Sequence, residues 1–167
     1  QVDPEPNSPG TIGNPDIPAP VMDPEFGKIV IDFFPHDNPE EPGHILMGYP
    51  PNLKLDNFSS SMLALFLETF ASGPGTNLYD LFINSESRKM DFGGNSAWGY
   101  AASDPGHPIF FGQSSVANAN VTEAKIDSAR AFIMAEIEKI SSLTNGSEEL
   151  KEFNDRAKAR LIQSFKQ

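Results

Sequence analysis

The sequence contains no cysteine, few basic residues and no long hydrophobic run. Without cysteine, the chain cannot form disulfides, thiolate zinc clusters or a cysteine nucleophile. Its 12 lysine and arginine residues are outnumbered by 23 acidic ones, which gives a formal net charge of −11. Nucleic-acid affinity comes largely from basic side chains, and a bilayer span needs roughly 20 apolar residues. We therefore expect neither nucleic acid nor a membrane as a partner.

The first 27 residues differ in composition from the rest of the chain. They hold seven prolines, five acidic residues and no lysine or arginine. Proline fixes φ and removes a backbone donor, so we interpret residues 1–27 as an extended acidic linker. The stretch "PDIPAP" at 15–20 also fits a PxxP ligand, as an alternative to a plain spacer. Because the chain opens on glutamine, we expect a processed or excised fragment.

Residues 28–167 are expected to form one domain with its own core. Runs of β-branched and aromatic residues predict strands, and apolar residues three or four positions apart predict helices. The strands are expected at 28–34, 44–49, 90–103 and 107–116, and the helices at 52–72, 77–86, 121–141 and 148–165. Short turns cannot join parallel neighbours. The order therefore predicts an α+β fold, a two-layer sandwich of a mainly antiparallel four-stranded sheet with helices on one face.

Periodicity also places side chains within these elements. Five apolar residues share a face of the first helix: Leu55, Phe58, Met62, Phe66 and Phe70. An isoleucine stripe on the third helix is predicted to be core: Ile126, Ile133, Ile137 and Ile140. In the strand at 90–103, Ser96, Trp98 and Tyr100 share one face, while Gly93 and Gly94 indicate a bulge or a close approach. The last two helices are expected to begin at an Asn120–Glu123 capping box and at Ser147.

The stretch "SGPGTN" at residues 72–77 packs two glycines around a proline between two predicted helices. It lacks the spacing and the lysine of a phosphate loop, and it follows a helix, whereas a phosphate loop follows a strand. Gly73 and Gly75 can take backbone angles closed to other residues, and Thr76 or Asn77 can cap the next helix. We therefore predict a bend between two helices rather than a ligand cradle.

The sequence predicts no catalytic and no cofactor-binding residue. A metal at His36 and His44, which flank three carboxylates in "HDNPEEPGH", is the weaker alternative to a solvated turn. Zinc needs three or four converging ligands, and a proline-interrupted turn gives no register that aims both imidazoles at one point. His107, in "PGHP", is interpreted as a turn residue. No GxSxG nucleophile elbow is present.

One ordered series of segments resembles a known family. Residues 44–140 are similar to one subdomain of the pitrilysin/insulinase-type zinc metallopeptidases, in the presequence-protease branch. The series runs through "HILMGYP", "NFSSSMLALFLETFASGP", "NLYDLFINSES", "MDFGGNSAWGY" and "HPIFFGQSSV", followed by a long amphipathic helix and "SEELKEF". From residue 28 onward the resemblance covers about four fifths of the chain, and it leaves only the acidic linker without a counterpart.

The resemblance implies a clamshell enzyme whose two halves, each made of two related α+β subdomains, enclose a peptide chamber. Such enzymes carry zinc in an H-x-x-E-H motif of the first subdomain. This chain has no H-x-x-E-H, so zinc is expected in the parent enzyme and no metal or other cofactor in this fragment. Arg88 and Tyr100 fall in a segment comparable to the family's substrate clamp, but their spacing departs from it and the role is not carried over.

The expected function is therefore that of a noncatalytic subdomain in the first half of a zinc peptidase. Its partners would be the remaining subdomains and unstructured peptide substrates, and the acidic balance suits basic peptides. The alternative is a peptidase homologue without a metal site that acts as a binding or scaffold module. Relatives of this design occur in organelles, periplasm and cytoplasm, so the resemblance identifies no compartment.

Overall fold

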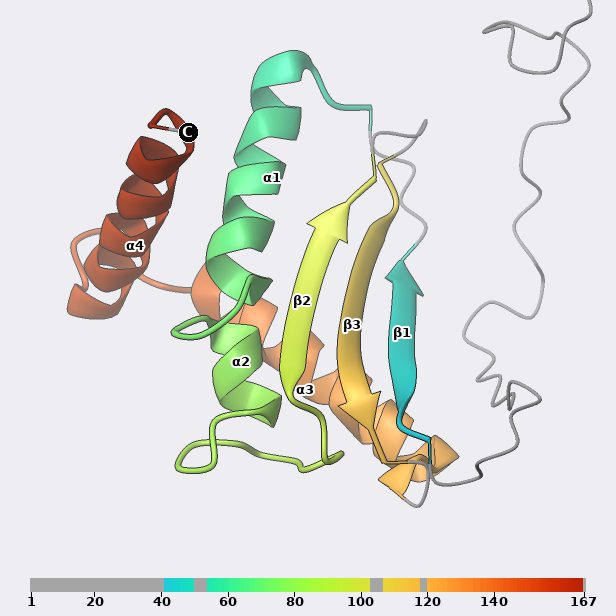
Figure 1. The fold of residues 1–167 in the computed structure, drawn as a ribbon. Coiled ribbons are helices and arrows are strands. Elements are labelled where there is room, and N and C mark those ends of the chain that lie inside the picture. The colour runs from blue at the N-terminus through green and yellow to red at the C-terminus, as the bar shows by residue number, and fades with distance from the viewer. Residues whose placement is uncertain (1–40, 50–53, 103–106, 118–119, 167) are drawn as a thin grey trace, which may run out of the picture. The chain divides into compact units, whose positions relative to one another are not determined.

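The computed structural model describes residues 41–49, 54–102, 107–117 and 120–166. All of them belong to the second of the two units into which the chain divides, Phe33–Gln167. The elements are β1 (Gly43–Tyr49), α1 (Asn57–Ala71), α2 (Asn77–Phe82), β2 (Ser96–Ala101), β3 (Ile109–Val116), α3 (Glu123–Ser141) and α4 (Glu148–Ser164), drawn in Figure 1. The strands and helices predicted from residue 44 onward are all present, with changed bounds.

The described strands form one antiparallel sheet in the order β1-β3-β2. The predicted antiparallel α+β architecture is confirmed, and the described residues supply three strands of the sheet. The expected strand at 28–34 lies outside the described residues, as does His36. A register shift between Gly43 and His44, opposite the left-handed Ser115 (φ 59°), bends the β1–β3 ladder near its end.

The helices pack on one face of this sheet, as the sequence predicts. Figure 1 shows α3 passing behind the strands, with α1 and α2 beside β2 and α4 against α1. The core face of the sheet buries alternate side chains from each strand, among them Ile45, Met47, Ala97 and Phe111. A Cβ on Gly99 would come within 2.9 Å of the Ala71 Cβ, so the absent side chain lets α1 approach β2 closely.

The apolar face predicted for α1 is buried only at its C-terminal end. Phe70 is fully buried, whereas Phe58 is 74% exposed and Met62 46% exposed. The N-terminal turns of α1 therefore extend past the sheet instead of packing on it. The Phe66 ring contacts both Phe70 and Phe153, with centroids 5.6 Å apart in each pair, so α1 also packs against α4.

The strand predicted at 90–103 is shorter than expected. Asp91 accepts a hydrogen bond from the Gly93 N–H at 2.7 Å, and Gly93 has a left-handed backbone (φ 76°), so an irregular turn precedes β2. A Cβ on Gly94 would lie 3.1 Å from the Ser114 carbonyl oxygen. The predicted close approach at these glycines is thus confirmed. The regular pairing of β2 with β3 begins only after them, at Ser96.

The two C-terminal helices follow the predicted patterns. Ile133 is buried, and the other three residues of the isoleucine stripe are partly buried against the same core. Ser147 caps α4 as expected. The predicted Asn120 capping box is wrong, because Thr122 accepts the Lys125 N–H and is the N-cap of α3. Both residue types are good caps, so spacing alone selected the wrong one.

Candidate functional site

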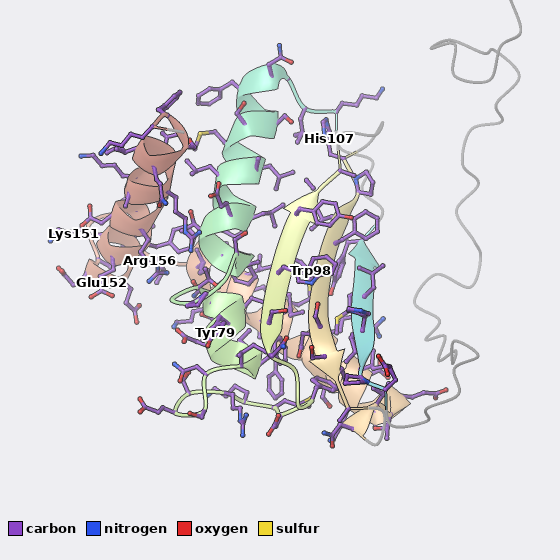
Figure 2. The ribbon with its side chains drawn as sticks, viewed as in Figure 1. Tyr79, Trp98, His107, Lys151, Glu152 and Arg156 are labelled. Atoms are coloured by element: carbon purple, nitrogen blue, oxygen red, sulfur yellow. The ribbon has the colours of Figure 1, made fainter. Side chains whose placement is uncertain are left out.

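The sheet face turned away from the helices carries a group of large apolar side chains. Strand alternation places Leu46 of β1, Phe110 of β3, and Trp98 and Tyr100 of β2 on this face. We call these four residues the aromatic platform. Leu46 is 60% exposed and Tyr100 50% exposed. Figure 2 shows Trp98 near the middle of the sheet, on the side away from α3.

The three aromatic rings form a continuous row. The Trp98 and Tyr100 ring centroids lie 5.8 Å apart with planes 26° apart, and those of Tyr100 and Phe110 lie 5.4 Å apart with planes 31° apart. The first pair is stacked and the second is tilted, and both centroid separations are in the favourable range for aromatic pairs. The row therefore holds its own geometry, with Tyr100 exposed and Trp98 and Phe110 half-buried.

Two glycines on the platform face make room for these rings. Gly112 lies between Leu46 and Trp98 across the sheet, and any Cβ placed there would overlap the Trp98 indole. A Cβ on Gly48 would lie 3.3 Å from Phe110 Cε1. The rings of Trp98 and Phe110 thus lean across the neighbouring strand, which is possible because these positions lack side chains.

The side chains of this face are suited to stacking and to burial of apolar surface. The three strands contain no aspartate, glutamate, lysine or arginine, and His44 at one end of β1 is their single imidazole. Trp98 Nε1 donates a hydrogen bond to Ser114 Oγ at 3.4 Å, which is long for such a bond. No acid–base pair or nucleophile–base pair lies on the platform.

The two described histidines, His44 and His107, lie on different parts of the chain, in β1 and just before β3. His44 is exposed on β1, paired in register with Ser114, and His107 has a left-handed backbone (φ 50°) before β3. The predicted turn role of His107 is confirmed. Within the described ranges, no group of three or more histidine, aspartate or glutamate side chains is arranged to hold a metal ion. The His36–His44 alternative stays a prediction, because His36 is outside those ranges.

The glycine-containing stretch at 72–77 is the bend between α1 and α2. Gly73 (φ 83°) and Gly75 (φ 75°) take the left-handed conformation, and Thr76 caps α2. From α4, Arg160 Nη2 donates to the Ser72 carbonyl oxygen at 3.1 Å, and Arg156 Nη2 donates to Asn77 Oδ1 at 3.0 Å. Figure 2 shows Arg156 between α4 and this bend. Both ends of the bend are therefore held by arginine side chains of α4, which fits a structural role.

One small cavity is enclosed between the described sheet and its helices. A cavity of about 10 Å³ lies between the core face and the helices, lined by residues that include Ile45, Phe111, Gln113 and Ile133. That volume fits about one water molecule. Gln113 Oε1 is buried without a hydrogen-bond partner among the described residues.

Among the described residues, Tyr49 and Asp56 have shifted pKa values, and neither lies on the platform. Burial raises the pKa of Tyr49, on the core face of β1, and the nearby charge of Arg130 opposes that shift. Hydrogen bonds from Ser59 lower the pKa of Asp56, the N-cap of α1. Tyr49 is thus neutral and Asp56 ionised at neutral pH. Both shifts belong to folding rather than to a reaction.

Two of the four platform residues could be placed on a common face from the sequence alone. Period-two alternation put Trp98 and Tyr100 on one face, but it assigned them no role. Leu46 and Phe110 were missed because they join the group only through cross-strand pairing. The signal that could have found them is the absence of charge from all three strands, since a solvated sheet face normally alternates apolar with polar residues.

Compared with known proteins, the chain matches no family model, no curated protein and no solved structure. Among the described residues, no helix combines the length and the apolar character that crossing a membrane requires.

Proposed function

We propose that this chain is a noncatalytic subdomain of a pitrilysin/insulinase-type zinc peptidase. In this proposal it forms part of the wall of a chamber for unstructured peptides, and zinc is held by another subdomain of the parent protein. The predicted fourth strand at residues 28–34 belongs to the same proposal. The chain itself would contribute no metal ligand and no catalytic group.

One observation carries the proposal, namely the order of elements around the bend at Gly73 and Gly75. A strand, a long apolar helix, a left-handed glycine bend, a short helix, two antiparallel strands and two helices follow one another as the resemblance implies. The helices share one face of the sheet, which is the layer arrangement expected of such a subdomain. This agreement supports the fold part of the resemblance.

Activity assays test the proposal directly. The full chain, incubated with zinc and a quenched basic peptide, is expected to hydrolyse nothing, because it has no H-x-x-E-H to activate water. The complete reading frame is expected to encode that motif roughly 200 residues upstream and to hydrolyse the same peptide. Turnover by the isolated chain that needs zinc, or an upstream region without the motif, would overturn the proposal.

The aromatic platform favours a second candidate, a binding module without enzymatic activity. An aromatic row on an uncharged sheet face, with Tyr100 exposed and Trp98 and Phe110 half-buried, is typical of a surface that contacts a partner. The upstream sequence separates the two candidates, because a module of this kind needs no zinc-bearing subdomain. Binding by the isolated chain is its required property.

A further inference from the structure

We propose that the aromatic platform binds a proline-rich peptide in the polyproline II conformation. This inference deepens the binding-module candidate and does not depend on the peptidase kinship. Its readout is binding to the isolated chain, whereas the kinship is tested by zinc-dependent turnover and by the upstream motif. Either can fail while the other holds.

The platform has the composition of a binding surface. Tyr100 and Leu46 are at least half exposed on the face of the sheet that no described helix covers. Charged residues are depleted and aromatic residues enriched at the centres of protein interfaces. Sheets that face only water usually carry charges, particularly on edge strands. Here β1 and β2, the two edges of the described sheet, contain no aspartate, glutamate, lysine or arginine.

The absence of charged side chains from this face restricts the chemistry of the ligand. Aromatic rows can also stack nucleic-acid bases, but such sites need lysine or arginine along the phosphate backbone. The three strands supply neither, and the chain carries a formal charge of −11. A strongly charged peptide of either sign would find no ion-pairing partner on these strands. A ligand with little charge and with apolar rings fits best.

Proline supplies such rings at little entropic cost. Polyproline II segments are preorganised, and they dock on aromatic-lined surfaces that also donate hydrogen bonds to the free peptide carbonyls. Tyr100 lies next to both other rings, 5.8 Å from Trp98 along β2 and 5.4 Å from Phe110 across the β2–β3 pair, so the three rings form one contiguous surface on which proline rings can pack. The long bond from Trp98 Nε1 to Ser114 Oγ leaves an indole donor that can turn to a peptide carbonyl.

The chain provides both a probe sequence and a reporter for the test. A synthetic peptide NPDIPAPV, the sequence of residues 14–21, is titrated into the full chain. Trp98 is the only tryptophan, so intrinsic fluorescence reports on the platform alone. We expect a saturable blue shift of the emission as the ring is covered. The peptide NADIAAAV, without prolines, is expected to give none.

Two variants localise the binding. Tyr100→Ala removes the central ring and is expected to weaken binding at least about tenfold, as loss of a stacking anchor does. Phe58→Ala is the matched control, because Phe58 is a 74% exposed aromatic on α1, away from the platform. It is expected to leave the affinity unchanged. Circular dichroism confirms that both variants keep the fold.

The titration is repeated on a chain with Pro15, Pro18 and Pro20 replaced by alanine, so that no second copy of the probe sequence is present. Failure of the peptide to produce a saturable shift in both chains overturns the proposal. Equal binding of the proline-free peptide overturns it as well. So does a folded Tyr100→Ala chain that binds as tightly as the unsubstituted one.

Discussion

At the scale of single residues, glycines decide where aromatic rings can lie on this sheet. Gly112 and Gly48 are on the platform face, and each lies beneath a ring that leans from a neighbouring strand. Glycine in a strand normally weakens it, so its use at these two positions is explained by the space that the rings occupy. The two sites differ in how closely the ring approaches, and this difference can be tested.

Gly112→Ala is expected to displace the Trp98 indole, because the new Cβ would overlap atoms of that ring. Overpacking of this kind costs about 1–3 kcal/mol of unfolding free energy. The displaced indole should become more exposed, so the tryptophan emission should shift to the red. Gly48→Ala is the control, since its Cβ would lie 3.3 Å from Phe110, and the Trp98 emission should not change. Identical emission from both variants would contradict the geometry of the platform.

At the scale of elements, helix caps couple the fold to pH. Asp56 Oδ1 accepts the Ser59 N–H at 2.7 Å and caps α1, and this bond lowers the pKa of the Asp56 carboxyl. A lowered pKa in the folded state means that the ionised form stabilises the fold. That contribution is complete above the ordinary aspartate value of about 3.9 and is lost as the pH falls through the lowered value.

Asp56→Asn is therefore expected to lose less stability than the unsubstituted chain when the pH falls from 5 to 2. Asparagine keeps the capping oxygen but does not titrate in this range. Thermal unfolding measured across these pH values checks the difference between the two chains. Asp56→Ala is the control, because it lacks the cap at every pH and should be less stable throughout. Parallel curves for the unsubstituted and Asn chains would contradict the assigned pKa shift.

The same scale shows how far sequence reasoning reaches. The existence and order of the elements could be predicted from residue 44 onward, because apolar periodicity is a local property of the chain. Boundaries were less predictable: β2 starts at Ser96 because Gly93 takes a left-handed conformation, which no periodicity encodes. The platform could not be predicted without the cross-strand register. The exposure of Phe58 could not be predicted either, because it depends on how far α1 extends past the sheet.

At the scale of the whole described unit, the four helices do not contribute equally to the hydrophobic core. The main core cluster draws buried residues from all three strands and from α1, α2 and α3, but none from α4. On α4, Phe153 alone is buried, and it contacts Phe66 of α1. The polar contacts of Arg156 and Arg160 with the bend add to this attachment. Arg156 Nε is buried without a hydrogen-bond partner among the described residues, so one polar atom at the contact between α4 and the bend lacks a hydrogen bond.

These contacts predict that α4 opens before the rest of the unit. Regions with few buried apolar contacts exchange their amide hydrogens through local opening rather than global unfolding. Phe153→Ala should cost about 3–5 kcal/mol of the attachment of α4, the usual loss for a buried phenylalanine. Hydrogen exchange of α4 should then accelerate, while the amides of β3, at the centre of the described sheet, keep their protection.

Phe165→Ala is the matched control for this prediction, because Phe165 follows α4 directly and is 83% exposed. Its removal should leave exchange in both α4 and β3 unchanged, since surface substitutions usually alter stability by less than about 0.5 kcal/mol. If Phe153→Ala instead accelerates exchange in β3 and α4 by the same factor, then α4 and the sheet unfold as one cooperative unit. In that case the single buried ring of Phe153 would be part of the global core, and the separation between the main cluster and α4 would have no energetic meaning.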